Sequence, residues 1–80
     1  MMKKKNNIKL KTNIHSLRRE KNISQQELAD SVDCRRETIG RVENGTYNPS
    51  LQLAMKIAKV FDKPVEDIFM YVELSQTDKF

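Results

Sequence analysis

Residues that could act as a nucleophile or a base are scarce in this chain. It contains one cysteine, Cys34, and one histidine, His15, nineteen positions apart. A nucleophilic thiol needs a base within hydrogen-bond reach and a third group that orients the base, and the short segments around these residues offer no such group. One cysteine allows neither an internal disulfide nor a cysteine-based metal site, and two glycines do not make a phosphate-binding loop. We therefore expect no enzymatic activity, no cofactor and no metal.

A more informative set of polar side chains lies on a short helix predicted over residues 35–44. Its inward positions are Ile39 and Val42, and its outward positions are Arg35, Arg36, Glu37, Gly40 and Arg41. An arginine can donate two hydrogen bonds to the O6 and N7 acceptors of guanine, and a glutamate can accept one from the amino group of cytosine. Gly40 costs the helix about 1 kcal/mol, which a close approach of the backbone to DNA would explain. The pattern alone also fits an ordinary solvated helix face.

The charge of the chain is unevenly distributed. The net charge is +4, with +7 on residues 1–21, 0 on residues 22–61 and −3 on residues 62–80. A basic beginning and an acidic end suit a molecule that turns one face toward a polyanion, although ordinary surface scatter gives similar numbers. No apolar run approaches the roughly 18 residues needed to cross a bilayer, and the lysine-rich start lacks the apolar stretch of a signal peptide. We expect a cytoplasmic protein without a membrane partner.

The elements that would position these residues are short helices. Residues 1–12 are predicted to contain a basic arm over residues 1–7, with Lys3, Lys4 and Lys5, and then a short strand over Ile8–Lys11. A first helix, capped by Asn13, ends at Asn22. The segment Ser24–Glu27 is a capping box that starts a second helix, and a turn at Asp33-Cys34 leads into the helix over residues 35–44, which Gly45 ends.

Two further helices and a second strand complete the predicted domain. Ser50 caps a helix over residues 50–61, and a short helix follows over residues 64–70. The apolar positions at helical spacing in the helix over residues 50–61 are Leu51, Ala54, Ile57, Ala58 and Phe61. Residues Met70–Leu74 are rich in strand formers and are expected to pair antiparallel with Ile8–Lys11. The fold class is therefore all-α, with five helices over residues 13–70 and a two-stranded ribbon that joins the N-terminal arm to a C-terminal extension, residues 71–80.

The joint pattern of these helices resembles the Cro/phage-repressor helix-turn-helix family of bacterial regulators, especially its short single-domain members. The resemblance rests on Leu17–Ala29, on the stretch Arg36–Gly45, on Tyr47–Leu51 with Ala54–Phe61, and on Val65–Phe69. Two short helices across a tight turn, the second with a polar outer face, are the geometry of that motif, whose second helix enters the major groove. The resemblance implies a five-helix fold and sequence-specific binding to double-stranded DNA.

The resemblance also implies roles for individual residues. The residues that would read bases are Arg35, Arg36, Glu37 and Arg41, and those that would contact the DNA backbone are Ser24, Gln25 and Asn44. Gln25 would also brace the recognition helix, and a salt bridge between Arg18 and Glu43 would tie the first helix to the recognition helix. Three positions depart from the family pattern: Asp33 replaces the usual glycine of the turn, Arg35 the usual Ser or Thr cap, and Pro64 the usual cap of the last helix. The first two put the start of the recognition helix in doubt. Cys34 occupies a small apolar position and is interpreted as a buried core thiol.

These inferences lead to two hypotheses. The first is a transcriptional regulator, specifically a repressor, that binds an inverted repeat as a homodimer through a surface around Pro64, Val65, Ile68 and Tyr71, because one helix reads too few base pairs to select a site. The second is an antitoxin-like interaction protein whose DNA binding serves only its own gene. No small-molecule ligand is evident, and the arm lysines are expected to add salt-sensitive affinity without specificity.

Overall fold

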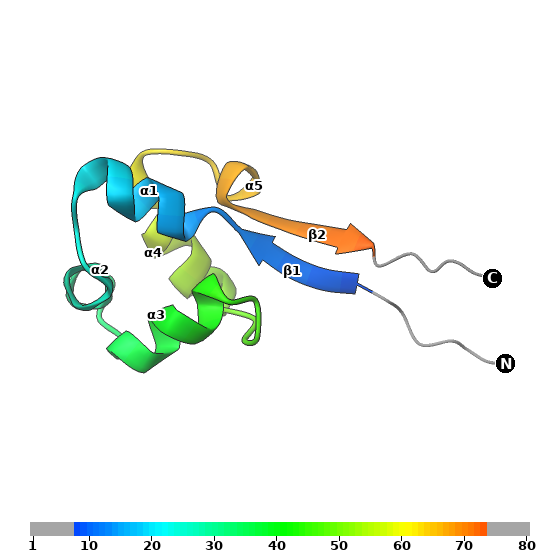
Figure 1. Ribbon diagram of the computed structural model, residues 1–80, viewed down its shortest axis with the longest axis horizontal. Helices are drawn as coiled ribbons and strands as arrows, with labels where there is room; N and C mark the ends of the chain where they lie inside the picture. Colours follow the sequence, from blue (N-terminus) through cyan, green and yellow to red (C-terminus); the bar gives the residue numbers. More distant parts are fainter. Residues whose placement is uncertain (1–7, 74–80) are drawn as a thin grey trace, which may run out of the picture.

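The computed structural model describes residues 8–73. The elements follow in the order β1 (Ile8–Thr12), α1 (Ile14–Lys21), α2 (Gln25–Ser31), α3 (Arg36–Glu43), α4 (Leu51–Phe61), α5 (Val65–Ile68) and β2 (Phe69–Glu73). Figure 1 shows the helices gathered into one body from which the two strands extend together. The predicted five helices and antiparallel ribbon are confirmed. The arm lysines Lys3, Lys4 and Lys5 and the chain beyond Glu73 lie outside the described residues.

Local hydrogen bonds mark the boundaries of the helices. The predicted capping box is present, because the Ser24 hydroxyl accepts from the Glu27 amide at 3.0 Å and the Glu27 carboxylate accepts from the Ser24 amide at 2.7 Å. Asn22 ends α1 in the left-handed conformation with φ 58°, and Ser50 caps α4 by accepting from the Leu53 amide at 3.0 Å. These caps satisfy backbone groups that would otherwise lack partners at the helix ends.

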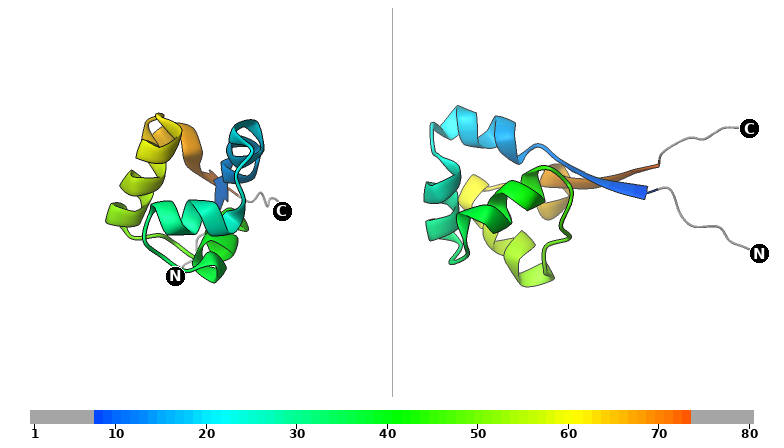
Figure 2. Two further views of the ribbon diagram at one scale, coloured as in Figure 1. Left: turned by 90° about the vertical axis from the view of Figure 1, so that its left-hand side faces the viewer. Right: turned by 60° about the horizontal axis from the view of Figure 1, so that its bottom comes forward.

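The helices enclose one apolar core to which every helix contributes. Its largest fully buried side chains are Ile14, Leu28, Ile39, Ile57, Ile68, Val32 and Val42. Figure 2 shows α1 to α5 packed around this centre, with the ribbon leaving the body as a narrow extension. Since α2 and α3 both present only one apolar side to the core, their polar sides are left toward solvent. No helix of residues 8–73 has the length and apolar character needed to cross a membrane.

Three local predictions need correction. Asn13 precedes α1 but makes no side-chain cap. Its side-chain amide instead donates to the Asp67 carbonyl at 3.0 Å. Helix α5 is shorter than predicted, because Phe69 is already extended, with φ −115° and ψ 135°, and begins β2. Leu51 has the helical spacing of the apolar stripe, but at the first position of α4 it is 73% exposed.

The ribbon is held to the body at both of its strands. β1 and β2 pair antiparallel in the register Ile8↔Glu73 to Thr12↔Phe69. Next to this pairing, the backbone amide of Asn13 donates to the Ile68 carbonyl at 3.2 Å. Gly45, in the turn after α3, has φ 75°, and a Cβ on it would lie 2.3 Å from the Leu10 carbonyl oxygen. The backbone of β1 therefore touches the end of α3 so closely that only glycine fits there.

The two glycines of the chain should respond oppositely to alanine. Gly45→Ala is expected to lower the free energy of unfolding by about 1–3 kcal/mol, because the new Cβ meets the Leu10 carbonyl and the positive φ is strained. Gly40→Ala is the matched control: its Cβ would meet only the Gln25 amide nitrogen at 3.9 Å, so the better helix former should stabilise the fold by about 0.5–1 kcal/mol. Urea unfolding of both variants measures the difference, and equal effects would contradict the proposed contact of β1 with the turn.

Candidate nucleic-acid interface

The polar sides of α2 and α3 form one continuous candidate surface. α2 and α3 pack against each other across a tight turn, in which Asp33 takes φ 61° and the Cys34 amide donates to the Ala29 carbonyl at 3.0 Å. Asp33 thus adopts the left-handed conformation that the usual glycine of this turn would take, and aspartate tolerates it better than most residues. The doubt raised by the missing glycine is removed, because the turn has the required geometry.

The side chains predicted to read bases all reach solvent from α3 or its start. Arg35 lies at the N-cap position and makes no side-chain cap, so the loss of the cap expected from the sequence is observed. The exposed residues on this surface are Arg35, Arg36, Glu37, Arg41 and Asn44, with Ser24 beside them at the start of α2. α3 itself runs from Arg36 to Glu43, one residue shorter at each end than predicted.

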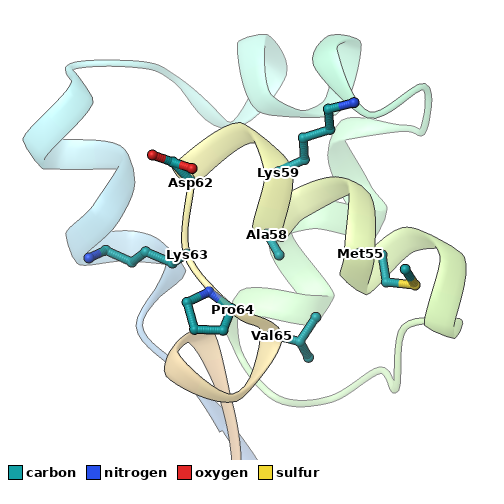
Figure 3. Close-up of a pocket in the computed structure, with 7 residues that line it drawn as sticks. All are labelled: Met55, Ala58, Lys59, Asp62, Lys63, Pro64 and Val65. Atoms are coloured by element: carbon teal, nitrogen blue, oxygen red, sulfur yellow. The ribbon is translucent and has the colours of Figure 1, made fainter.

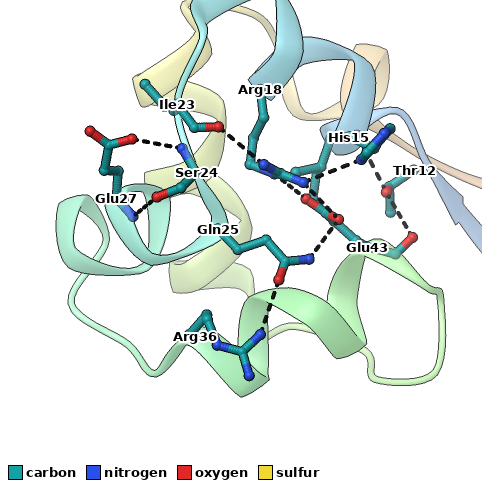
Figure 4. A network of polar contacts seen from close by, with 10 residues as sticks. Thr12, His15, Arg18, Ile23, Ser24, Gln25, Glu27, Arg36 and Glu43 are labelled. Atoms are coloured by element: carbon teal, nitrogen blue, oxygen red, sulfur yellow. Dashed lines mark hydrogen bonds and ion pairs between the residues drawn. The ribbon is translucent and has the colours of Figure 1, made fainter.

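A buried ion pair between α1 and α3 fixes this surface to the body. The Arg18 Nε donates to Glu43 Oε2, and its Nη2 lies 3.4 Å from Glu43 Oε1, with the two side chains 11% and 7% exposed. Arg18 Nη1 donates to the Ile23 carbonyl at 3.0 Å (Figure 4). Both charges are thus compensated by several hydrogen bonds, which is the condition under which a buried pair is tolerated.

Gln25 extends the ion pair toward the exposed surface. Its Nε2 donates to Glu43 Oε1 at 3.0 Å, and its Oε1 accepts from Arg36 Nη1 at 3.1 Å, as Figure 4 shows. Only this orientation of the amide satisfies both neighbours, because a carboxylate cannot donate and a guanidinium cannot accept. The chain of contacts Arg18–Glu43–Gln25–Arg36 therefore connects the centre of the domain to a predicted base-reading residue.

Two members of this network were missed in the sequence. His15 Nδ1 lies 3.2 Å from Arg18 Nη2, and since arginine has no acceptor the histidine nitrogen must accept. The Thr12 hydroxyl donates to the Glu43 carbonyl at 3.4 Å. The spacing of three residues between His15 and Arg18, which places them on one helix face, is the signal from which the first contact could have been predicted. Nothing in the sequence pointed to the second, because it depends on the position of β1.

Cys34 is only half-buried, so its interpretation as a fully buried core thiol is wrong. Its side chain packs against the edge of the core, and the thiol donates to the Arg35 carbonyl at 3.6 Å. Burial raises the pKa of the Cys34 thiol, the neighbouring Asp33 carboxylate raises that pKa further, and Lys56 opposes them. The thiol stays protonated at neutral pH, which makes it a poor nucleophile.

The predicted assembly residues are not all at the surface. Pro64 and Tyr71 are exposed and Val65 is half-buried, but Ile68 is completely buried in the core. Ile68 therefore cannot contribute to a contact with another molecule, and its apolar character is explained by packing within the domain.

The fold and this surface define a helix-turn-helix DNA-binding domain. The helix-turn-helix family model matches residues 14–68, so the chain belongs to this family. A transcriptional regulator of this type from Archaeoglobus fulgidus is 52% identical over 64 residues, which cover 80% of this chain and 90% of that protein. YgzD from Bacillus subtilis, a regulator of the same type, is 39% identical over 64 residues, covering 80% of this chain and 97% of its own length.

A repressor and solved structures are also similar. The transcriptional repressor RstR of the cryptic phage CTXphi from Vibrio cholerae is 29% identical over 66 residues, 82% of this chain and 60% of that protein. The restriction-modification controller protein C.AhdI from Aeromonas hydrophila has a TM-score of 0.62 and 33% identity over 68% of this chain and 78% of its own. The transcriptional regulator VanUg shares the fold, with a TM-score of 0.72 and 16% identity over 92% of this chain and 97% of its own. The chain is a DNA-binding transcriptional regulator of the Cro/C1 helix-turn-helix type.

Removal of one partner of the buried pair should destabilise the fold more than removal of both partners. Glu43→Gln leaves Arg18 buried without its counter-charge and should cost about 3 kcal/mol of unfolding free energy. The double variant Arg18→Met/Glu43→Met, which leaves no unpaired charge, should recover most of that loss. Glu37→Gln, an exposed glutamate on the same helix, is the control and should change stability by less than about 0.5 kcal/mol. Urea unfolding tests this, and a double variant as unstable as the single would refute the explanation.

Proposed function

We propose that this regulator represses transcription by placing α3 in the major groove of an operator in cytoplasmic DNA, without catalysing any reaction. The observation that carries the proposal is the Gln25–Arg36 hydrogen bond, because it ties an exposed arginine at the start of α3 to the buried Arg18–Glu43 pair. A side chain held in place before binding loses less conformational entropy when it meets a base. The hydrogen bond to Gln25 uses one of the five guanidinium donors of Arg36, which leaves a two-donor edge for O6 and N7 of guanine.

The neighbouring residues divide between bases and backbone in this proposal. Arg35, Glu37 and Arg41 are exposed with Arg36 and would contact base edges, and Ser24, Gln25 and Asn44 would contact the sugar–phosphate backbone. The Gln25 amide has a second N–H that the intramolecular network does not use, and a phosphate oxygen can accept it. Gln25 would thus link the backbone contact to the base-reading helix.

Substitution of Arg36 and Gln25 distinguishes these roles. Arg36→Ala should weaken binding to the operator by about 1–3 kcal/mol and relax the preference at one base pair, and Arg36→Lys should not restore that preference because lysine lacks the two-donor edge. Gln25→Ala should weaken binding to random duplex through the lost phosphate contact, and should weaken binding to the operator further because Arg36 loses the hydrogen bond that positions it. Arg19→Ala, an exposed arginine on α1 with the same charge change, is the control. Fluorescence anisotropy on both duplexes reads the outcome, and equal losses on both for Arg36→Ala would overturn the assignment.

We further infer that the regulator binds an inverted repeat as a homodimer, with the recognition helices one DNA turn, about 34 Å, apart. Support comes from a groove between α4 and α5, in which Met55 and Val65 lie beside Pro64 (Figure 3). Met55 is 58% exposed and continues the apolar surface to Leu51. Large exposed apolar side chains that lie together are typical of an interaction surface.

The charges around this groove suit contact with a second copy. Lys59 and Lys63 lie at its rim beside Asp62, and α5 carries the exposed Glu66 and Asp67. In a two-fold contact the same patch meets itself, so lysines of one copy can meet carboxylates of the other. Tyr71, 64% exposed on β2, remains a proposed part of the same assembly.

Met55→Asp should convert the dimer to a folded monomer, because the exposed side chain contributes little to the core but would place a charge in the apolar contact. Asn48→Asp, which adds the same charge in the exposed loop before α4, should leave assembly unchanged. Sedimentation equilibrium at several concentrations measures the state, and the dimer should bind full sites more tightly than half-sites. A wild-type protein that is monomeric at every concentration would contradict the inference.

The antitoxin-like alternative is not favoured. The segment that would bind a protein partner is the C-terminal extension after Met70, of which residues 74–80 lie outside the described part of the chain. The similar proteins named above are transcriptional regulators and a phage repressor.

A further inference from the structure

The ribbon is the part of the described structure that the helix-turn-helix motif does not account for. The family match covers residues 14–68, and β1 and β2 lie entirely outside it, at Ile8–Thr12 and Phe69–Glu73. A two-stranded ribbon is marginally stable by itself. Here it is anchored through the contact of Leu10 with Gly45 and through the hydrogen bond from Thr12 to the Glu43 carbonyl. Both anchors lie at the C-terminal end of α3, so the ribbon has a defined position relative to the recognition helix.

The register of the ribbon places both lysines of β1 on the face opposite to Leu10, beside Val72 and Met70 of β2. Leu10 is opposite Tyr71 and Leu10 is buried, whereas Lys9 and Lys11 alternate with it and therefore point to the other face. Both lysines are exposed, and within residues 8–73 neither forms an ion pair with a carboxylate. The ribbon thus presents two lysines, whose backbone positions are about 7 Å apart along the strand and whose charge is not compensated by the rest of the described structure.

Lys9 lies directly beside the end of the recognition helix. Its Cε is 3.8 Å from the position that a Cβ on Gly45 would occupy, so the side chain extends over the turn that follows Asn44. Figure 1 shows β1 on the side of the ribbon nearer to α3, and Figure 2 shows it continuing beyond the end of that helix. Lys9 therefore lies beside the C-terminal end of the candidate surface formed by α2 and α3, and Lys11 follows it on the same face of β1.

We propose that Lys9 and Lys11 of β1 form a second phosphate-binding position that contacts the sugar–phosphate backbone beside the C-terminal end of α3. The proposal rests on the proposed placement of α3 in the major groove. α3 has eight residues and is about 12 Å long, which is close to the width of that groove. When the helix lies across the groove, its end comes close to the wall of phosphates, where the two lysines are located. Such contacts orient the protein and add affinity, but they do not read sequence.

Salt dependence measures this contact directly. Each phosphate neutralised by a cation contributes about −0.9 to the slope of log K against log salt concentration. Lys9→Gln and Lys11→Gln should each make the slope shallower by about 0.9, and the double variant by about 1.8, equally on operator and random duplex. Lys9→Arg/Lys11→Arg should retain the wild-type slope. Lys21→Gln is the control, because it removes the same charge from the exposed end of α1, outside the ribbon and the assembly groove, and should leave the slope unchanged.

The outcomes separate this proposal from the function on which it rests. A double variant that keeps the wild-type slope and still prefers the operator would overturn the phosphate contact while leaving the regulator function intact. A double variant that loses operator preference selectively, or that changes only the sedimentation behaviour, would also overturn it, by assigning the lysines to base readout or to assembly. A wild-type protein that binds no duplex would contradict the proposed function itself, before any lysine is changed.

Discussion

The burial of one charge pair, Arg18 with Glu43, constrains the rest of the interface. A carboxylate near the end of a helix that approaches DNA would repel phosphate if it were free, and it would be costly to bury without a partner. Arg18 removes both problems by pairing with it from α1, with the side chains 11% and 7% exposed. Because a buried ion pair tolerates little displacement, the distance between α1 and α3 is set by the geometry of a guanidinium against a carboxylate. α3 thus behaves as a rigid part of the domain although it has only eight residues.

Gln25 transmits this constraint to the surface and couples α2 to α3. Its amide is held at one end by Glu43 and holds Arg36 at the other. The same end of α3 that carries Glu43 also contacts β1, through the Glu43 carbonyl and through Gly45. The ion pair, the amide bridge and the ribbon therefore meet at one helix, so a shift of α3 would disturb all of them together. Coupling of this kind favours a single geometry of the binding surface over an ensemble of loosely related ones.

Features that follow from residue type and spacing were predictable from the residues themselves, and contacts between distant side chains were predictable only where the family resemblance implied them. The capping box at Ser24 and the end of α1 at Asn22 follow from residue type and spacing, and the ribbon follows from two alternating segments. Leu51 has the spacing of the apolar stripe but is exposed, and Ile68 was assigned to the assembly surface but is buried, because helical spacing identifies an apolar stripe and does not say where the core ends. The brace by Gln25 and the Arg18–Glu43 pair were implied by the family resemblance and are present. The contact of Gly45 with Leu10 also connects residues far apart in the chain, and no pattern along the sequence reports it.

Gly40 lowers the stability of the free domain at a position on the proposed DNA-binding side of α3. A glycine within a helix costs about 1 kcal/mol relative to alanine. Nothing within the described structure requires it, since an added Cβ would meet only the Gln25 amide nitrogen at 3.9 Å, an ordinary contact distance. The proposed placement of α3 in the major groove would supply a reason, on the side of α3 that carries Arg36, Glu37 and Arg41. A duplex packed against this side would leave little room for a methyl group between the helix backbone and the DNA. The proposed close approach of α3 to DNA thus accounts for the stability that the free domain loses at Gly40.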